Sequence, residues 1–288
     1  MTSFANNGTR RQTVLVCTAA CLFALIALAG GLGLSPARAM TASESAASTA
    51  TTASTPTVTT RDGRLRGVTR GAVKEFLGVP YAAPPIGHLR FRAPRPAAPW
   101  RGLRDATRFG RACVQFEPIP GAGSQSENCL YLNIWEPKNV RPSSKLPVLL
   151  WYHGGGLAFG AGSQYRGQLL AQVTHTIVIT INYRLGALGY LALPQLDGEN
   201  PRLGSGNYGL LDQIQALRWV RSNVAAFGGD PRRVTIAGES AGGLSVCGVL
   251  ASPLARGLFQ QAIIESFPCA SAELSGSRAD VEKTSARF

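Results

Sequence analysis

The pentapeptide Gly238-Glu239-Ser240-Ala241-Gly242 constrains the fold of this chain more than any other segment. It follows a β-branched run at residues 234–237 and precedes residues 241–250, which we expect to be helical. A sharp strand-to-helix turn excludes β-carbons at its crowded positions, and the two glycines meet this need. Ser240 can then adopt a strained backbone conformation with its hydroxyl clear of the sheet, as a nucleophile elbow requires. The alternative is an ordinary loop in which Ser240 only caps the helix.

The segments around this turn alternate between strand and helix patterns. Residues 146–152 and 176–182 are near-continuous apolar runs, which are typical of strands buried on both faces. Residues 208–224 carry apolar side chains mostly at spacings of three and four, which predicts a helix. A further strand is expected at residues 261–264. The order predicts an α/β fold with a mainly parallel sheet and helices on both faces.

The part of the domain before these segments has a β pattern. We expect residues 64–68 and 73–77 to pair as a hairpin and residues 130–135 to form a strand. The proline-rich residues 80–100 are too interrupted for a helix or a central strand.

A second glycine motif, His153-Gly154-Gly155-Gly156, directly follows the buried run that ends at Tyr152. Successive glycines let backbone N–H groups converge on one point, as an oxyanion hole needs when a carbonyl becomes tetrahedral. Alone, such a turn could also cradle a phosphate or merely link two elements. Its position upstream of the elbow favours the oxyanion hole.

Six further runs extend the pattern over about residues 61–266. They are Phe76-Leu77-Gly78-Val79-Pro80-Tyr81-Ala82, Leu89-Arg90-Phe91, Ser126-Glu127-Asn128-Cys129-Leu130-Tyr131-Leu132-Asn133, Asn182-Tyr183-Arg184-Leu185-Gly186, Gly209-Leu210-Leu211-Asp212-Gln213 and Phe227-Gly228-Gly229-Asp230-Pro231. Together with the two glycine motifs, they resemble the type-B carboxylesterase family, which includes the cholinesterases and many bacterial esterases. The resemblance implies an α/β-hydrolase fold that hydrolyses carboxylic esters.

The resemblance also implies roles for individual residues. Ser240 would be the acylated nucleophile, and the backbone N–H groups of Gly155, Gly156 and Ala241 would form the oxyanion hole. The substrate would be a small-molecule ester, and we expect no cofactor and no metal.

Structural roles follow from the same resemblance. Cys113 and Cys129 would form the first disulfide of the family, and two buried ion pairs are expected, Arg90 with Glu127 and Arg184 with Asp212. Cys247 and Cys269 lie in or beside apolar segments, and as plain thiols they need no function.

The catalytic histidine is the main gap in this pattern. In this fold the triad runs serine, acid, histidine along the chain, whereas His88, His153 and His175 all precede Ser240. His153 is better placed to orient the oxyanion loop than to act as base. The later acids Glu273, Asp280 and Glu282 lie in a polar tail and are expected to be solvated.

We therefore expect the acid and histidine to belong to a C-terminal part that this chain lacks, with residues 61–288 forming a partial domain. Two interpretations remain open. One is a serine ester hydrolase, and the other is an inactive truncated remnant or a non-catalytic binding protein of the same fold.

The N-terminus reads as an export signal. Arg10 and Arg11 precede an uncharged stretch and an Ala37-Arg38-Ala39 site, so residues 1–39 are a predicted signal peptide. Residues 40–60, rich in Ala, Ser and Thr, are expected to be a disordered linker. The protein would then be secreted or extracytoplasmic, without stable membrane insertion after cleavage; an uncleaved anchor is the alternative.

The net charge of +13 does not indicate a nucleic-acid partner. Loss of residues 1–39 removes three arginines and no acid, which leaves +10. The remaining arginines are mostly scattered rather than clustered on one helix or interleaved with aromatic residues. A solvated basic surface is the better interpretation, and the sequence does not set an oligomeric state.

Overall fold

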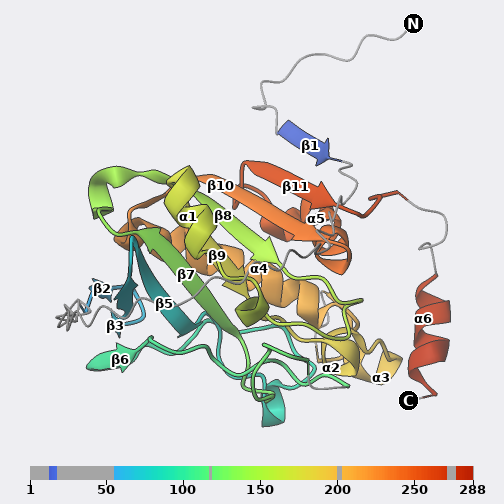
Figure 1. Cartoon of the computed structure of the whole chain (residues 1–288). Coiled ribbons are helices and arrows are strands. Elements are labelled where there is room, and N and C mark those ends of the chain that lie inside the picture. The colour runs from blue at the N-terminus through green and yellow to red at the C-terminus, as the bar shows by residue number, and fades with distance from the viewer. Residues whose placement is uncertain (1–12, 18–54, 117–118, 200–202, 271–276, 288) are drawn as a thin grey trace, which may run out of the picture.

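The computed structural model in Figure 1 describes the backbone of residues 13–17 and residues 55–116, 119–199, 203–270 and 277–287. Its main feature is an eight-stranded sheet with the order β1-β11-β10-β8-β9-β7-β5-β4. The strands are β1 (Thr13–Cys17), β4 (Val68–Arg70), β5 (Val73–Pro80), β7 (Tyr131–Pro137), β8 (Leu146–Tyr152), β9 (Ile177–Ile181), β10 (Gly229–Glu239) and β11 (Gln261–Glu265). Pairing is parallel from β1 to β9 and antiparallel from β9 to β4.

Helices cover both faces of this sheet. The helices of the described ranges are α1 (Gln168–Thr174), α2 (Gly186–Tyr190), α3 (Pro194–Asp197), α4 (Tyr208–Asn223), α5 (Ala241–Ala251) and α6 (Arg278–Ser285), of which α1, α4 and α5 contact the strands. Short 3-10 turns are η1 (Gly87–Leu89), η2 (Pro142–Ser144), η3 (Gly162–Gln164), η4 (Val224–Phe227) and η5 (Pro253–Ala255). Figure 1 shows α1 over one face of the sheet and α4 and α5 over the other. The predicted alternation of strands and helices is confirmed.

The strand β9 is buried on both faces of the sheet. All five of its residues are buried, as the continuous apolar run predicts. Val178 packs with Trp135 and Ala171 in the cluster under α1. Its neighbours Ile177 and Ile179 belong to the larger core on the other face. Alternate side chains of one strand therefore enter two separate hydrophobic layers.

The predicted hairpin is wrong in its first strand. Residues 64–66 form β3 (Arg64–Arg66), which belongs to a second, three-stranded sheet with β2 (Thr57–Thr59) and β6 (Leu103–Asp105). The strand that pairs antiparallel with β5 is β4 instead. Gly67 lies between the strands of the two sheets, at a position where a β-carbon would lie 2.5 Å from the backbone oxygen of Glu75. Local periodicity could not reveal that residues 64–68 are divided between two sheets.

The predicted linker is also wrong at its end. Thr57–Thr59 pair antiparallel with β3, so the ordered domain begins before residue 61. The rest of the predicted linker, residues 40–54, and most of the predicted signal peptide lie outside the described residues.

The strand β1 lies within the predicted signal peptide. It pairs parallel with β11 over five residues, from Thr13 opposite Gln261 to Cys17 opposite Glu265. β1 therefore occupies the outer edge of β11. Cleavage after Ala39 would remove β1 and leave that edge open to association. No helix in the described ranges is both long and apolar enough to span a membrane.

Candidate active site

Ser240 stands at the sharp turn between β10 and α5. Its backbone angles are φ 54° and ψ −121°, which confirms the strained conformation predicted for this residue. The Ser240 N–H donates a 3.0 Å hydrogen bond to the Glu265 carbonyl, which ties the turn to β11.

The two flanking glycines are required by close backbone contacts. A β-carbon on Gly238 would lie 2.4 Å from the carbonyl atoms of Gly242. A β-carbon on Gly242 would lie 2.1 Å from the Tyr152 carbonyl oxygen at the end of β8. The sequence therefore folds into this turn only because both positions lack side chains.

The glycine loop after β8 passes directly beside Ser240. A β-carbon on Gly154 would lie 3.5 Å from the Ser240 Cβ and 2.9 Å from the Glu239 carbonyl oxygen. The Ser240 side chain is half-buried, and its hydroxyl makes no hydrogen bond to any residue that the structure describes. The candidate nucleophile thus has a free hydroxyl next to the predicted oxyanion loop.

The loop leaves backbone donors free. Gly155 and Gly156 have φ of 106° and 60°, and the Gly155 carbonyl accepts hydrogen bonds from Ala158 and Phe159 that close a tight turn. Across the described ranges, the N–H groups of Gly155, Gly156 and Ala241 donate no hydrogen bond. These are the three groups that sequence analysis assigned to the oxyanion hole.

His153 begins the loop and is fully buried. Its Nδ1–H donates to the Gly154 carbonyl at 2.8 Å, because that oxygen can only accept. Burial lowers the pKa of His153 to about 4, so the ring is neutral at pH 7. The ring is bonded to its own loop, as expected for a residue that orients the loop.

A buried hydrogen-bond network lies beneath the two glycine motifs, and sequence analysis missed it. The Gln213 amide donates to Ser245 Oγ at 2.8 Å, and Ser245 Oγ donates to the Ala241 carbonyl at 2.9 Å. The Tyr183 hydroxyl donates to the His153 carbonyl at 2.6 Å. Burial raises the pKa of Tyr183. Tyr183 and Gln213 lie in runs that carried the resemblance, but the runs indicate no partner.

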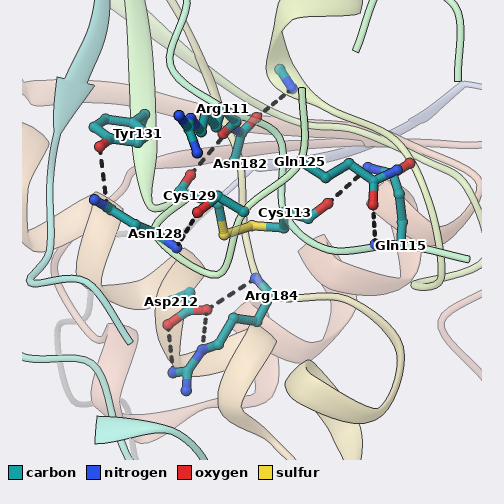
Figure 2. Close-up of a disulfide and its surroundings, with 12 residues drawn as sticks. Arg111, Cys113, Gln115, Gln125, Asn128, Cys129, Tyr131, Asn182, Arg184 and Asp212 are labelled. Atoms are coloured by element: carbon teal, nitrogen blue, oxygen red, sulfur yellow. Dashed lines mark hydrogen bonds and ion pairs between the residues drawn. A yellow bond between two sulfur atoms is a disulfide. The ribbon is translucent and has the colours of Figure 1, made fainter. Parts of the chain in front are cut away.

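The predicted first disulfide is present between Cys113 and Cys129, with Cα atoms 4.9 Å apart (Figure 2). This spacing is within the expected range for a bridge. Asn182 supports it, because its side-chain amide donates to the carbonyls of Arg111 (2.9 Å) and Cys129 (3.2 Å).

A second disulfide joins Cys247 of α5 to Cys269, with Cα atoms 5.4 Å apart. The expectation that these cysteines are plain thiols is wrong. Residues 266–269 turn back from the end of β11 toward α5, which neither sequence segment reveals alone. The signal that could have found it is the even number of cysteines in a chain with an export signal.

Of the two predicted buried ion pairs, one is buried and one is not. Arg184 binds both carboxylate oxygens of Asp212 at 2.8 and 2.7 Å, and both side chains are almost fully enclosed (Figure 2). Arg90 binds Glu127 at 2.6 Å, but these side chains are 44% and 25% exposed. Their burial was wrongly predicted, since η1 places Arg90 at the surface.

The remaining histidines and acids make no hydrogen bond to Ser240 within the described part of the chain. His88 lies in the exposed turn η1, and the exposed His175 follows α1; neither hydrogen-bonds to Ser240. Asp280 caps α6 through Ser277, and Glu282 pairs with Arg278. Glu273 lies outside the described residues. Within the described ranges, no group of three or more His, Cys, Asp or Glu side chains could hold a metal.

A cleft of about 770 Å³ opens beside the predicted oxyanion loop. Its walls include Gly156 and Leu157 of the loop, Tyr190 of α2, and Arg278 and Val281 of α6. Ser240 is not part of its lining. An ion pair between Arg278 and Asp197 fastens α6 to α3 at this cleft.

The fold and this site define a class of protein. A strand–elbow–helix serine beside a glycine loop, on a sheet with helices on both faces, is the arrangement of the α/β-hydrolases. The model of the carboxylesterase family matches residues 54–286, and the chain belongs to that family.

Several relatives are closely similar. A para-nitrobenzyl esterase of Bacillus subtilis is 47% identical over 219 residues, covering 73% of this chain and 43% of that protein. A fumonisin B1 esterase of Sphingopyxis macrogoltabida is 49% identical over 212 residues, covering 72% and 39%. Among solved structures, a carboxylesterase of Geobacillus stearothermophilus has a TM-score of 0.73 at 43% identity, covering 80% of this chain and 47% of the other. The chain spans less than half the length of these relatives.

Proposed function

We propose that this chain carries the nucleophile half of a carboxylic ester hydrolase, with Ser240 as nucleophile. The observation that supports this most is the free hydroxyl of a serine held at φ 54° beside Gly154. In the reaction, Ser240 Oγ attacks the ester carbonyl carbon, the alcohol leaves with a proton, and water then releases the acid from the acyl-serine. The N–H groups of Gly155, Gly156 and Ala241 would stabilise the tetrahedral oxyanion.

The substrate in this proposal is a small-molecule ester. Relatives named for para-nitrobenzyl and fumonisin B1 esters support the class without fixing the compound.

The proposal places the triad acid and histidine outside these 288 residues. His153 is neutral and bonded to Gly154, and the other two histidines make no contact with Ser240. The same observation favours a second candidate, a non-catalytic or inactive protein of the same fold. We also propose export, because two disulfides suit an oxidising compartment.

A fluorophosphonate probe tests the nucleophile directly. The full chain and a Ser240→Ala variant would be incubated with the probe, and labelled peptides identified by mass spectrometry. Modification at Ser240, absent from the variant, is expected when imidazole is added as the missing base, because Ser240 Oγ must lose its proton to attack phosphorus and the free oxyanion donors then stabilise the adduct. Equal labelling of both proteins, or none of either, would favour the non-catalytic candidate.

A further inference from the structure

A second cleft, of about 500 Å³, lies beside the Cys113–Cys129 disulfide and contains no residue of the proposed catalytic site. Its walls carry three arginines and three uncharged side chains able to form hydrogen bonds. They are Arg104, Arg108, Arg111, Ser126, Asn128 and Tyr131.

The charge in this cleft is uncompensated. In the described part of the chain, Arg104, Arg108 and Arg111 form no ion pair and donate no side-chain hydrogen bond. The guanidinium of Arg104 lies over the Trp100 ring at 5.3 Å, which leaves its N–H groups available. One acid, Asp105, also lines the cleft, but it pairs with Arg66 at 3.6 Å. Three arginines therefore gather in this cleft, although the arginines of the chain are mostly scattered along the sequence.

The arginine wall is held by backbone packing. A β-carbon on Gly78 of β5 would lie 2.6 Å from the Arg108 carbonyl oxygen. A β-carbon on Gly110 would lie 2.5 Å from the Tyr131 ring. The Arg111 carbonyl accepts a hydrogen bond from Asn182. The loop that carries Arg108 and Arg111 is thus fixed against β5 and β7, although the guanidinium groups reach solvent.

The opposite wall supplies a neutral donor. Asn128 accepts a 3.1 Å hydrogen bond from the Tyr131 hydroxyl through its Oδ1, which turns its Nδ2 group away from that partner. Its backbone N–H bonds to Ser126 Oγ at 3.1 Å. Figure 2 shows Arg111, Asn128 and Tyr131 grouped beside Cys129. The disulfide links the two walls, since Arg111 precedes Cys113 by two residues and Asn128 directly precedes Cys129.

We propose that this cleft binds a tetrahedral oxyanion, the phosphate or sulfate group of a small molecule. A guanidinium group presents two parallel N–H donors, which two oxygens of a phosphate or sulfate can accept together. It also stays charged at any physiological pH. Three of them with the Asn128 amide give a donor set without a competing free acid. The volume fits a small ligand rather than a polymer.

Calorimetric titration of the full chain with sodium sulfate and with inorganic phosphate tests the site. Ionic strength is held constant with sodium chloride, so that screening does not imitate binding. We expect saturable binding with one site per chain. An Arg108→Gln/Arg111→Gln variant should bind at least tenfold more weakly, and Asn128→Asp should also weaken binding because it adds a negative charge.

The matched control is Arg218→Gln, because Arg218 is exposed on α4 and carries the same charge. It should leave the affinity unchanged. Equal affinities for wild type and the double variant would overturn the proposal, as would a heat signal that never saturates. Tighter, length-dependent binding of an oligonucleotide through Arg108 and Arg111 would also overturn it, since the ligand would then be a polymer. Unchanged thermal unfolding of each variant confirms that it is folded.

Discussion

Tyr183 makes two contacts with His153: its hydroxyl donates a 2.6 Å hydrogen bond to the His153 carbonyl, and its ring stacks on the imidazole with centroids 4.4 Å apart. Both groups are fully buried. Because Tyr183 follows β9 and His153 follows β8, these contacts fix the ends of two neighbouring parallel strands. The glycine loop that follows β8 therefore begins from an immobilised residue.

Replacing Tyr183 by Phe tests how much the hydrogen bond to the His153 carbonyl stabilises the protein. The stacked ring is kept, but the His153 carbonyl loses its donor, so the free energy of unfolding should fall by about 1–3 kcal/mol. Urea denaturation measures the change. Tyr152→Phe is the matched control, because the Tyr152 hydroxyl is buried without a hydrogen-bond partner among the described residues. A larger loss in Tyr152→Phe than in Tyr183→Phe would contradict the assignment.

The close backbone contacts at the Ser240 turn predict how the protein responds to replacement of glycine by alanine. A methyl group at Gly242 would press on the Tyr152 carbonyl, so Gly242→Ala should destabilise the protein by about 3 kcal/mol or more, or prevent folding. Gly248→Ala on the same helix meets only the flexible Leu210 side chain at 3.2 Å. It should be neutral or stabilising by up to about 1 kcal/mol, because alanine favours the helix. Thermal unfolding of the two variants separates these effects, and equal melting temperatures would refute the steric account.

Glu136 predicts a pH dependence of stability. Burial raises the pKa of Glu136 from 4.5 to about 7, and the hydrogen bond and charge of Lys74 only partly oppose this. Since the folded protein holds the proton more tightly, this contribution is full below pH 4.5 and is lost as the pH rises to about 7. The loss is roughly 3 kcal/mol at most.

Denaturant unfolding at pH 5 and pH 8 measures this difference. Glu136→Gln cannot ionise and should flatten the slope. Asp280→Asn is the control, because hydrogen bonds from Ser277 lower the pKa of Asp280 and give a contribution that is lost as the pH falls instead. A wild-type slope retained in Glu136→Gln would rule Glu136 out as its source.

The second disulfide predicts the thiol content of the chain without residues 1–39. Without residues 1–39, the chain has four cysteines, and all four are paired in the structure. Thiol titration of the unfolded protein should give none before reduction and four after it. Cys247→Ser/Cys269→Ser should lower the free energy of unfolding by about 3 kcal/mol in the chain-entropy model. Two free thiols before reduction would contradict the Cys247–Cys269 bridge.

How much of this could be predicted depends on the range of each interaction. The Ser240 turn was predictable because its glycines lie within five residues of one another and are required by close contacts at the turn itself. The bridge from Cys247 to Cys269 was not, because it depends on how the chain returns after β11. Ser245 was missed for a related reason. Its role follows from Gln213, which lies 32 residues away and reaches it only in the folded core.

The last prediction concerns catalysis by the chain alone. Ser240 attacks an ester only if a base accepts its proton, and the buried His153, with its pKa of about 4, is bonded to Gly154 instead. Related serine hydrolases that lack one triad member keep about 10³–10⁴-fold of rate enhancement over water, and an incomplete pocket should retain less. Hydrolysis of 4-nitrophenyl acetate by the full chain should therefore be barely faster than by Ser240→Ala. Added imidazole can serve as the missing base, so it should raise the rate of the wild type above the rate that the Ser240→Ala control reaches with the same imidazole. Fast turnover without imidazole that Ser240→Ala abolishes would reveal a base within this chain, and His153 would then be the first residue to replace.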